Sequence, residues 1–338
     1  MLLSIIIPAF NAEKYVANSI KNIFKQRINN DSFEVIIVND GSVDKTKEMV
    51  LKLQKEHSNV VLLNQENKGS SVARNNGIKL AKGEYIFFFD CDDYLADDTL
   101  PVILKVAKKF KPNIVAFDAI RTNNFNLNIS QKNKIDFEKI EVIKGQYFLE
   151  KNPEHRLEVW WYILNREFLL KTGLSFKEGV FHQDVIFTLS LFIEANKVIK
   201  LPIDVYRYYQ SEGSSIRNKK SSHLKKIIDD YITLFNDIED FLSRFKIKYP
   251  ELKNSIVYNI NKRKHRDAFF MINRMIRAKF KTKCFNAYLE KLKKTDSYPI
   301  SYAAIDNQTN KLKYTILVFI VNNRLMVNLV LITYRFFK

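Results

Sequence analysis

The sequence predicts an α/β fold in which a mostly parallel sheet is flanked by helices and followed by a basic helical extension. Over the first half of the chain, short apolar runs of strand length alternate with amphipathic segments, as in β-α-β units. Polar residues follow these runs, at the expected carboxyl edge of the sheet. Residues 241–338 carry 21 Lys and Arg against 5 Asp and Glu, whereas residues 1–240 carry 34 against 32.

The expected strands follow one another within the first 90 residues. Each is a β-branched or aromatic run closed by turn-forming residues. These runs cover residues 2–7, 33–38, 60–63 and 85–89. A helical pattern follows the first run, with Tyr15, Ile20 and Ile23 on its apolar side, and another begins near Asp44. Parallel connections of this kind bring the ends of the strands to one edge of the sheet.

The fourth run ends in three carboxylates, Asp90, Asp92 and Asp93. Two oxygen donors one residue apart can both reach a hard cation such as Mg²⁺ or Mn²⁺, whose remaining positions are filled by diphosphate oxygens and water. An Asp-x-Asp sequence by itself is more typical of a solvated acidic turn. The preceding strands favour the metal site.

Four sequence blocks together resemble the family 2 glycosyltransferases of the GT-A fold. They are Ser4–Asn11, Val38–Ser42, Lys68–Gly77 and Gly83–Asp93, and the resemblance extends from Leu3 to about Ile216. It implies a Rossmann-like catalytic domain at residues 1–218, divided into a nucleotide-binding part at 1–118 and an acceptor part at 119–218. Residues 219–338 would form the helical basic region.

The resemblance implies a site for a UDP-sugar donor in the nucleotide-binding part. Asp40 would accept the uracil N3 proton in a hydrogen bond, Pro8 and Phe10 would lie along the base, and Arg74 would contact the uridine or its diphosphate. Asp90 would hold the ribose hydroxyls and Asp92 the Mn²⁺ or Mg²⁺ ion, while Asp93 would support the turn. Outside this context, Asp40-Gly41-Ser42 is typical of an ordinary strand-ending turn.

A second candidate is the acid at the start of the apolar helical stretch that runs to Ile193. Inverting sugar transfer needs a base opposite the leaving nucleotide, and the resemblance implies this role for Asp184. Gln183 stands where the family commonly has Glu, which removes one negative charge beside the base. The alternative is that Asp184 only caps the helix. His182, beside it, is expected to be a hydrogen-bonded structural residue, and a metal ligand is the alternative for that side chain.

Two further segments are expected near the substrates. The resemblance implies that a polar loop after Tyr206 closes over the donor diphosphate. Arg207, Ser214 and Arg217 are its expected phosphate contacts, and a solvated linker is the alternative. Trp160 and Trp161 are expected near the acceptor because aromatic faces suit sugar rings, with core packing as the alternative for at least one of them.

The basic extension indicates a polyanionic partner. Nucleic acid is not expected, because no aromatic platform lies within a basic groove, so the expected partner is an anionic membrane surface. Residues 314–337 are strongly apolar, but Arg324 lies near their middle, where a spanning helix would bear a cost of ~2.5–3.5 kcal/mol. Arg324, Asn328 and Arg335 share one helical face, which predicts a helix lying in the interface. Packing on the protein's own core or on a dimer partner is the alternative.

The sequence as a whole predicts an inverting hexosyl- or N-acetylhexosaminyltransferase that acts on a lipid-linked or cell-surface glycan at the cytoplasmic face of the cell membrane. Two cysteines provide no disulfide framework, and none of the eight glycines forms a G-x-G-x-x-G or P-loop motif. These absences disfavour dehydrogenases and P-loop enzymes. A non-catalytic, membrane-associated scaffold with the GT-A fold is the alternative, against which the four acidic site residues argue. A homo-oligomer remains open, as does the sugar transferred.

Overall fold

The computed structural model describes residues 1–130, 135–210, 221–306 and 310–336. The chain divides into two compact units, Met1–Arg217 and Asn218–Lys338. The expected boundary after residue 218 differs from this division by one residue.

The first unit is built on an eight-stranded sheet with the strand order β3-β2-β1-β4-β7-β6-β8-β5. One half of this sheet consists of four parallel strands, which correspond to the four expected runs: β1 (Leu3–Ala9), β2 (Phe33–Asp40), β3 (Val60–Gln65) and β4 (Tyr85–Phe88). The other half contains β5 (Tyr94–Leu95), β6 (Ile114–Thr122), β7 (Tyr162–Asn165) and β8 (Val198–Tyr209). β7 runs antiparallel to both β4 and β6. The predicted α/β fold with a mostly parallel sheet is confirmed.

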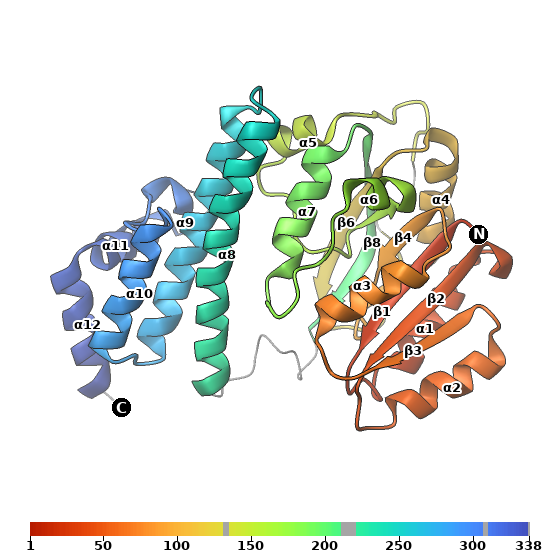
Figure 1. Cartoon of the computed structure of the whole chain (residues 1–338), viewed down its shortest axis with the longest axis horizontal. Coiled ribbons are helices and arrows are strands. Elements are labelled where there is room, and N and C mark those ends of the chain that lie inside the picture. The colour runs from red at the N-terminus through yellow and green to blue at the C-terminus, as the bar shows by residue number, and fades with distance from the viewer. Residues whose placement is uncertain (131–134, 211–220, 307–309, 337–338) are drawn as a thin grey trace. The chain divides into compact units, whose positions relative to one another are not determined.

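Helices flank this sheet (Figure 1). They are α1 (Val16–Phe24), α2 (Thr46–Glu56), α3 (Ser70–Leu80), α4 (Thr99–Phe110), α5 (Gly145–Lys151), α6 (Arg166–Thr172) and α7 (Gln183–Glu194). α3 can pack closely on β1 because Gly77 has no side chain: a Cβ atom there would lie 2.4 Å from Cγ2 of Ile6. This close approach fixes the helix that carries Arg74.

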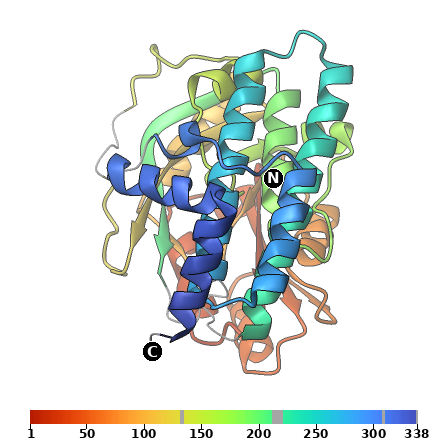
Figure 2. The ribbon, with the colours of Figure 1, turned by 90° about the vertical axis from the view of Figure 1, so that its left-hand side faces the viewer.

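The second unit contains five α-helices within its described residues (Figure 2). They are α8 (Ser221–Lys248), α9 (Asn254–Arg277), α10 (Thr282–Lys294), α11 (Lys311–Asn322) and α12 (Arg324–Phe336). The predicted helical extension is therefore present. Lys264 of α9 does not add to the basic surface of this extension, because its side chain is 1% exposed and pairs with Glu239 and the carbonyl of Thr295.

The prediction of a single helix over residues 314–337 is wrong. The chain forms α11 and α12 instead, bent by 100° at the break between them. The side chain of Asn322 exchanges two hydrogen bonds with the backbone of Ile300, which fixes the end of α11. Asn323 Oδ1 accepts the N–H groups of Leu325 and Met326, so it caps the start of α12.

Within the described residues, length and composition allow a membrane-crossing segment only where these two helices are combined. None of the helices in the described ranges is long and apolar enough to cross a membrane alone, whereas the bent pair α11 and α12 meets both requirements together.

Candidate functional site

Candidate residues lie at the carboxyl ends of β2 and β4 and near the starts of α3 and α7. Asp40 is the last residue of β2, and Asp90 follows β4 by two residues. Arg74 lies in the second turn of α3, and Asp184 is the second residue of α7. Arg74 and Asp90 are in direct contact, and both influence Asp184 through their charges.

Asp40 folds the loop that leads into α3. Its carboxylate is 4% exposed and accepts hydrogen bonds from Gln65 Nε2 (2.8 Å) and the backbone N–H groups of Lys68 (2.8 Å) and Gly69 (2.9 Å). Gly69 adopts a φ of +87°, which favours glycine. Oδ2 receives only the Gly69 bond in the described structure, so its second lone pair can accept an N–H donor from a ligand.

Pro8 and Phe10 lie at the end of β1, the strand beside β2. Pro8 is half-buried, and Phe10 is 50% exposed. An exposed aromatic ring beside the edge of the sheet offers an apolar face to a flat ligand.

Arg74 forms an ion pair with Asp90, with 2.8 Å between Nη2 and Oδ1. Arg74 is 8% exposed, and its guanidinium lies 5.6 Å from the centre of the Phe176 ring. The pair places a buried positive charge beside the acidic turn that ends β4. A charged, hydrogen-bonded pair of this kind, with one partner buried, holds both side chains in one orientation.

Asp93 and Asp92 of this turn have different environments. Asp93 is buried and accepts hydrogen bonds from the Tyr206 hydroxyl (2.6 Å) and the Tyr209 N–H (2.7 Å). Burial, with the nearby charges of Asp90 and Asp92, raises its pKa well above the ordinary value. Asp92 is half-buried and lines a cavity of about 270 Å³.

The described residues contain no group of three or more His, Cys, Asp or Glu side chains that could hold a metal ion. A cation at Asp92 would therefore depend on oxygen atoms of the substrate and on water. Mg²⁺ is commonly bound in this way, by one or two carboxylates together with substrate phosphates. Asp92 lies on the wall of a cavity that Asp93 and Asp97 also line, and a half-buried carboxylate in this position fits such an ion.

Asp184 has the environment of a base that works near neutral pH. Burial raises the pKa of its carboxyl group to about 7; the positive charge of Arg74 opposes this increase, and the charges of Glu158 and Asp90 add to it. A base is most effective when its pKa lies close to the working pH. Asp184 can therefore take up and release a proton under ordinary conditions.

Arg207, one of the three expected phosphate contacts, does not take part in this arrangement. Arg207 is completely buried, and its guanidinium donates to the carbonyls of Leu127 (2.7 Å) and Ile129 (3.1 Å) and to Asp204 (2.8 Å). This geometry counts against the predicted phosphate contact, because the charge is already neutralised and enclosed. Ser214 and Arg217 lie outside the described residues.

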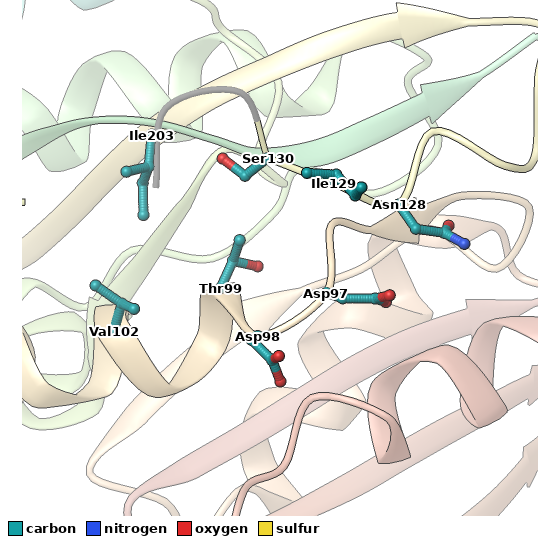
Figure 3. Close-up of a pocket in the computed structure, with 8 residues that line it drawn as sticks. All are labelled: Asp97, Asp98, Thr99, Val102, Asn128, Ile129, Ser130 and Ile203. Atoms are coloured by element: carbon teal, nitrogen blue, oxygen red, sulfur yellow. The ribbon is translucent and has the colours of Figure 1, made fainter. Parts of the chain in front are cut away.

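Arg207 instead holds the segment after β6 beside α4. A cavity of about 330 Å³ lies between the two (Figure 3). Asn128, Ile129 and Ser130 line one side, and Thr99 and Val102 of α4 line the other. None of the candidate site residues lines this cavity.

The two tryptophans belong to the core. Trp160 stacks on Tyr206 (4.5 Å between ring centres), and Trp161 stacks on Phe192 (5.4 Å). Both are less than 5% exposed, so core packing accounts for both rings. His182 is the N-cap residue of α7.

Sequence reasoning missed Tyr206 and Ser70. The Tyr206 hydroxyl donates to Asp93 and accepts the backbone N–H of Asp90 (3.2 Å), which holds the acidic turn. Ser70 Oγ accepts a hydrogen bond from Gln183 Nε2 (2.6 Å). Each contact joins residues more than 100 positions apart in the sequence, so a local sequence pattern cannot predict it.

Comparisons with known proteins identify the family of this chain. The sequence model described as "Glycosyl transferase family 2" matches residues 4–173, half of the chain. The uncharacterized glycosyltransferase EpsJ of Bacillus subtilis is 28% identical over 70% of each chain. The cholesterol galactosyltransferase of Borreliella burgdorferi is 25% identical over 73% of this chain and 72% of its own.

Similar structures include residues 1–349 of S. aureus TarS in complex with UDP-GlcNAc, with a TM-score of 0.65 and 18% identity over 99% of this chain and 92% of that one. At this identity the likeness supports the fold, which is that of the GT-A enzymes. The family match and the relatives named glycosyltransferases confirm the expected enzyme class, rather than the alternative of a non-catalytic scaffold. The chain therefore belongs to glycosyl transferase family 2 and is a glycosyltransferase of the GT-A fold.

Proposed function

We propose that this glycosyltransferase moves a hexosyl or N-acetylhexosaminyl group from a UDP-sugar to a lipid-linked or cell-surface glycan, with inversion at the anomeric carbon. The observation that carries this proposal is the contact of Arg74 with Asp90 on one side and its electrostatic influence on Asp184 on the other. The guanidinium of Arg74 is therefore close enough to act on both Asp90, the proposed donor contact, and Asp184, the proposed base with a pKa near 7.

The comparisons support the donor and the acceptor class. TarS, which has a similar fold, binds UDP-GlcNAc and UDP in its structures. The minor teichoic acid biosynthesis protein GgaB of Bacillus subtilis is 29% identical over 73% of this chain, although this covers 27% of GgaB itself. The likeness to TarS supports a UDP-sugar as the donor, and the likeness to GgaB supports a polymer of the teichoic acid type as the acceptor.

In the proposed donor site, Asp40 accepts the N3–H of uracil while Phe10 and Pro8 lie along the base. Arg74 and Asp90 orient the uridine and its ribose. Asp92 holds Mn²⁺ or Mg²⁺, which when bound neutralises charge on the diphosphate leaving group. The donor is thereby fixed with its anomeric carbon towards α7.

In the proposed transfer step, Asp184 takes the proton of an acceptor hydroxyl. The hydroxyl oxygen forms a bond to the anomeric carbon as the bond between that carbon and the β-phosphate oxygen breaks. UDP leaves with the electron pair of the broken bond. Attack opposite the leaving group inverts the configuration.

The donor assignment is tested by offering UDP-glucose, UDP-galactose, UDP-GlcNAc and UDP-GalNAc with Mn²⁺. We expect at least one to raise the melting temperature and to be hydrolysed slowly to UDP, because water can replace the acceptor. GDP-mannose is the control nucleotide sugar. Stabilisation by GDP-mannose alone would overturn the uridine assignment.

The rate of transfer should depend on pH through Asp184. The carboxylate accepts a proton only when it is ionised, and its pKa is raised to about 7. The rate constant kcat should therefore fall about tenfold for each pH unit below 7 and level off above pH 8. Initial rates from pH 5 to 9 at saturating donor measure this profile. A profile that is flat down to pH 5 would contradict the assignment.

We also propose that the second unit binds the cytoplasmic face of an anionic membrane. α11 and α12 each have two apolar stripes. Val318, Val321, Val327 and Leu331 are at most 1% exposed and pack within the unit. Exposed side chains four and three residues apart form the other stripes: Leu312, Ile316 and Phe319 on α11, and Leu325, Leu329 and Ile332 on α12. Packing on the protein's own core therefore explains the buried stripe of each helix. The exposed stripe of each helix is available to bind a partner.

Charge favours lipid as that partner. Lys311 and Lys313 lie at the start of α11 and Arg324 at the start of α12, and all three are exposed. Each Lys or Arg near an anionic surface contributes ~1 kcal/mol, and the exposed stripes can insert among the lipid headgroups.

The double variant Phe319→Glu with Leu329→Glu should lose most of its sedimentation with anionic liposomes, because both changes place charge on the inserting stripes. Ile247→Glu on α8 is the matched control, since Ile247 is 81% exposed but lies outside α11 and α12. It should sediment like the original chain. If the original chain ignores liposomes and forms a dimer that the double variant loses, a second copy covers these stripes instead.

A further inference from the structure

Gln183 joins the first turns of two helices. Its side chain is 6% exposed, and its Nε2 donates a hydrogen bond to Ser70 Oγ at 2.6 Å. Ser70 begins α3 directly after Gly69, whose N–H group is bonded to Asp40. One end of the carboxamide is therefore fixed to the loop that Asp40 folds, while the backbone of Gln183 leads directly to Asp184.

The other end of this carboxamide is buried without a partner. In the described structure, neither Gln183 Oε1 nor Arg74 Nε has a hydrogen-bond partner, although both atoms are shielded from solvent. Ser70 and Arg74 are four residues apart on α3, so their side chains lie on the same face, one turn apart. Buried polar atoms in folded proteins nearly always have partners. Two such atoms beside the candidate base indicate partners that arrive with the substrate.

The chemistry of the two atoms restricts what can satisfy them. Gln183 Oε1 accepts a hydrogen bond and Arg74 Nε donates one. A phosphate oxygen could serve Arg74 but not the carbonyl of Gln183, because an ionised phosphate oxygen has no proton to donate. A hydroxyl group can donate to one and accept from the other. The donor sugar is the part of the substrate that is rich in hydroxyls and must lie beside Asp184 for transfer to occur.

We propose that Gln183, together with Arg74 Nε, binds a hydroxyl group of the transferred sugar and so helps to select the sugar. This inference rests on the proposed UDP-sugar donor. It also gives a reason for Gln at position 183, because a neutral acceptor binds the hydroxyl without adding a third negative charge to those of Glu158 and Asp90 that act on Asp184.

The test compares binding of UDP with binding of a UDP-sugar, since only the latter carries the hydroxyl. Isothermal titration with Mn²⁺ is carried out on the original chain, Gln183→Met and Gln183→Glu, using UDP and the tightest binder among the four UDP-sugars named above. Met has a similar volume but lacks a strong acceptor. Glu keeps an acceptor and can receive a hydrogen bond from the Ser70 hydroxyl.

Gln183→Met should weaken UDP-sugar binding about 3- to 10-fold, the scale of one neutral hydrogen bond, while UDP binding stays within twofold. Gln183→Glu should restore UDP-sugar binding. The Glu variant should also move the acid limb of the pH profile upward, because it adds a negative charge beside Asp184.

Two results would overturn the inference. Equal losses for UDP and the UDP-sugar would show that Gln183 only positions the Asp40 loop, and unchanged binding of both would show that it contacts neither. A failure of the proposed donor is distinguishable, because the original chain would then bind neither UDP nor any UDP-sugar, and the inference would fall with it.

Discussion

Asp184→Asn should lower kcat by about 10²- to 10⁴-fold while the dissociation constant for UDP changes less than twofold. The amide has nearly the same size as the carboxylate but cannot take the proton of the acceptor hydroxyl, and general bases contribute on this scale. UDP contacts are proposed to come from residues before α7, so binding should survive. Single-turnover rates and UDP titration measure the two effects separately.

Glu194→Gln is the matched control for this variant, because it removes a carboxylate from the last residue of the same helix. Its kcat should stay within twofold. If Asp184→Asn retained full turnover and lost only thermal stability, Asp184 would be a helix cap and the base would lie elsewhere.

Asp92→Asn should reduce transfer by about 10²-fold or more and remove the benefit of Mn²⁺ for UDP binding. A divalent cation contributes several kcal/mol to stabilising a departing diphosphate, and a factor of ten corresponds to about 1.4 kcal/mol. Titration of UDP with and without Mn²⁺ measures the loss. Folding should persist, because Asp92 is half-buried on the wall of a cavity.

Asp97→Asn is the control for the metal, since Asp97 is an exposed acid that lines the same cavity. It should keep its response to Mn²⁺. Full transfer by the original chain in EDTA, or an equal loss in both variants, would remove Asp92 as the metal ligand.

The sequence predicted the half of the sheet formed by β1 to β4 well because its signals are local. The β-branched runs that form β1 and β2 are buried in the sheet. The residues that follow each run therefore lie at the carboxyl edge of the sheet. Asp40 and Asp90 are found there for that reason. The position of Asp184 at the start of α7 could be predicted from the apolar stretch behind it.

Features that depend on distant partners could not be predicted. Arg207 lies next to a polar loop in sequence, but its carbonyl partners Leu127 and Ile129 are about 80 positions away. The break between α11 and α12 depends on the bonds of Asn322 to Ile300. Trp160 stacks on Tyr206, a contact that composition alone does not distinguish from a sugar platform.

The beginning of α3 restricts how such an enzyme could be recombined with its relatives. Gly69, Ser70 and Arg74 are attached to Asp40, Gln183 and Asp90, respectively. A chimera with a crossover between residues 77 and 183 would join one parent's α3 to the other parent's α7. Such a hybrid should function only when residues 70 and 183 remain a compatible pair. The two halves of the first unit are therefore not freely interchangeable, because the start of α3 is hydrogen-bonded both to Asp40 at the end of β2 and to Gln183 at the start of α7.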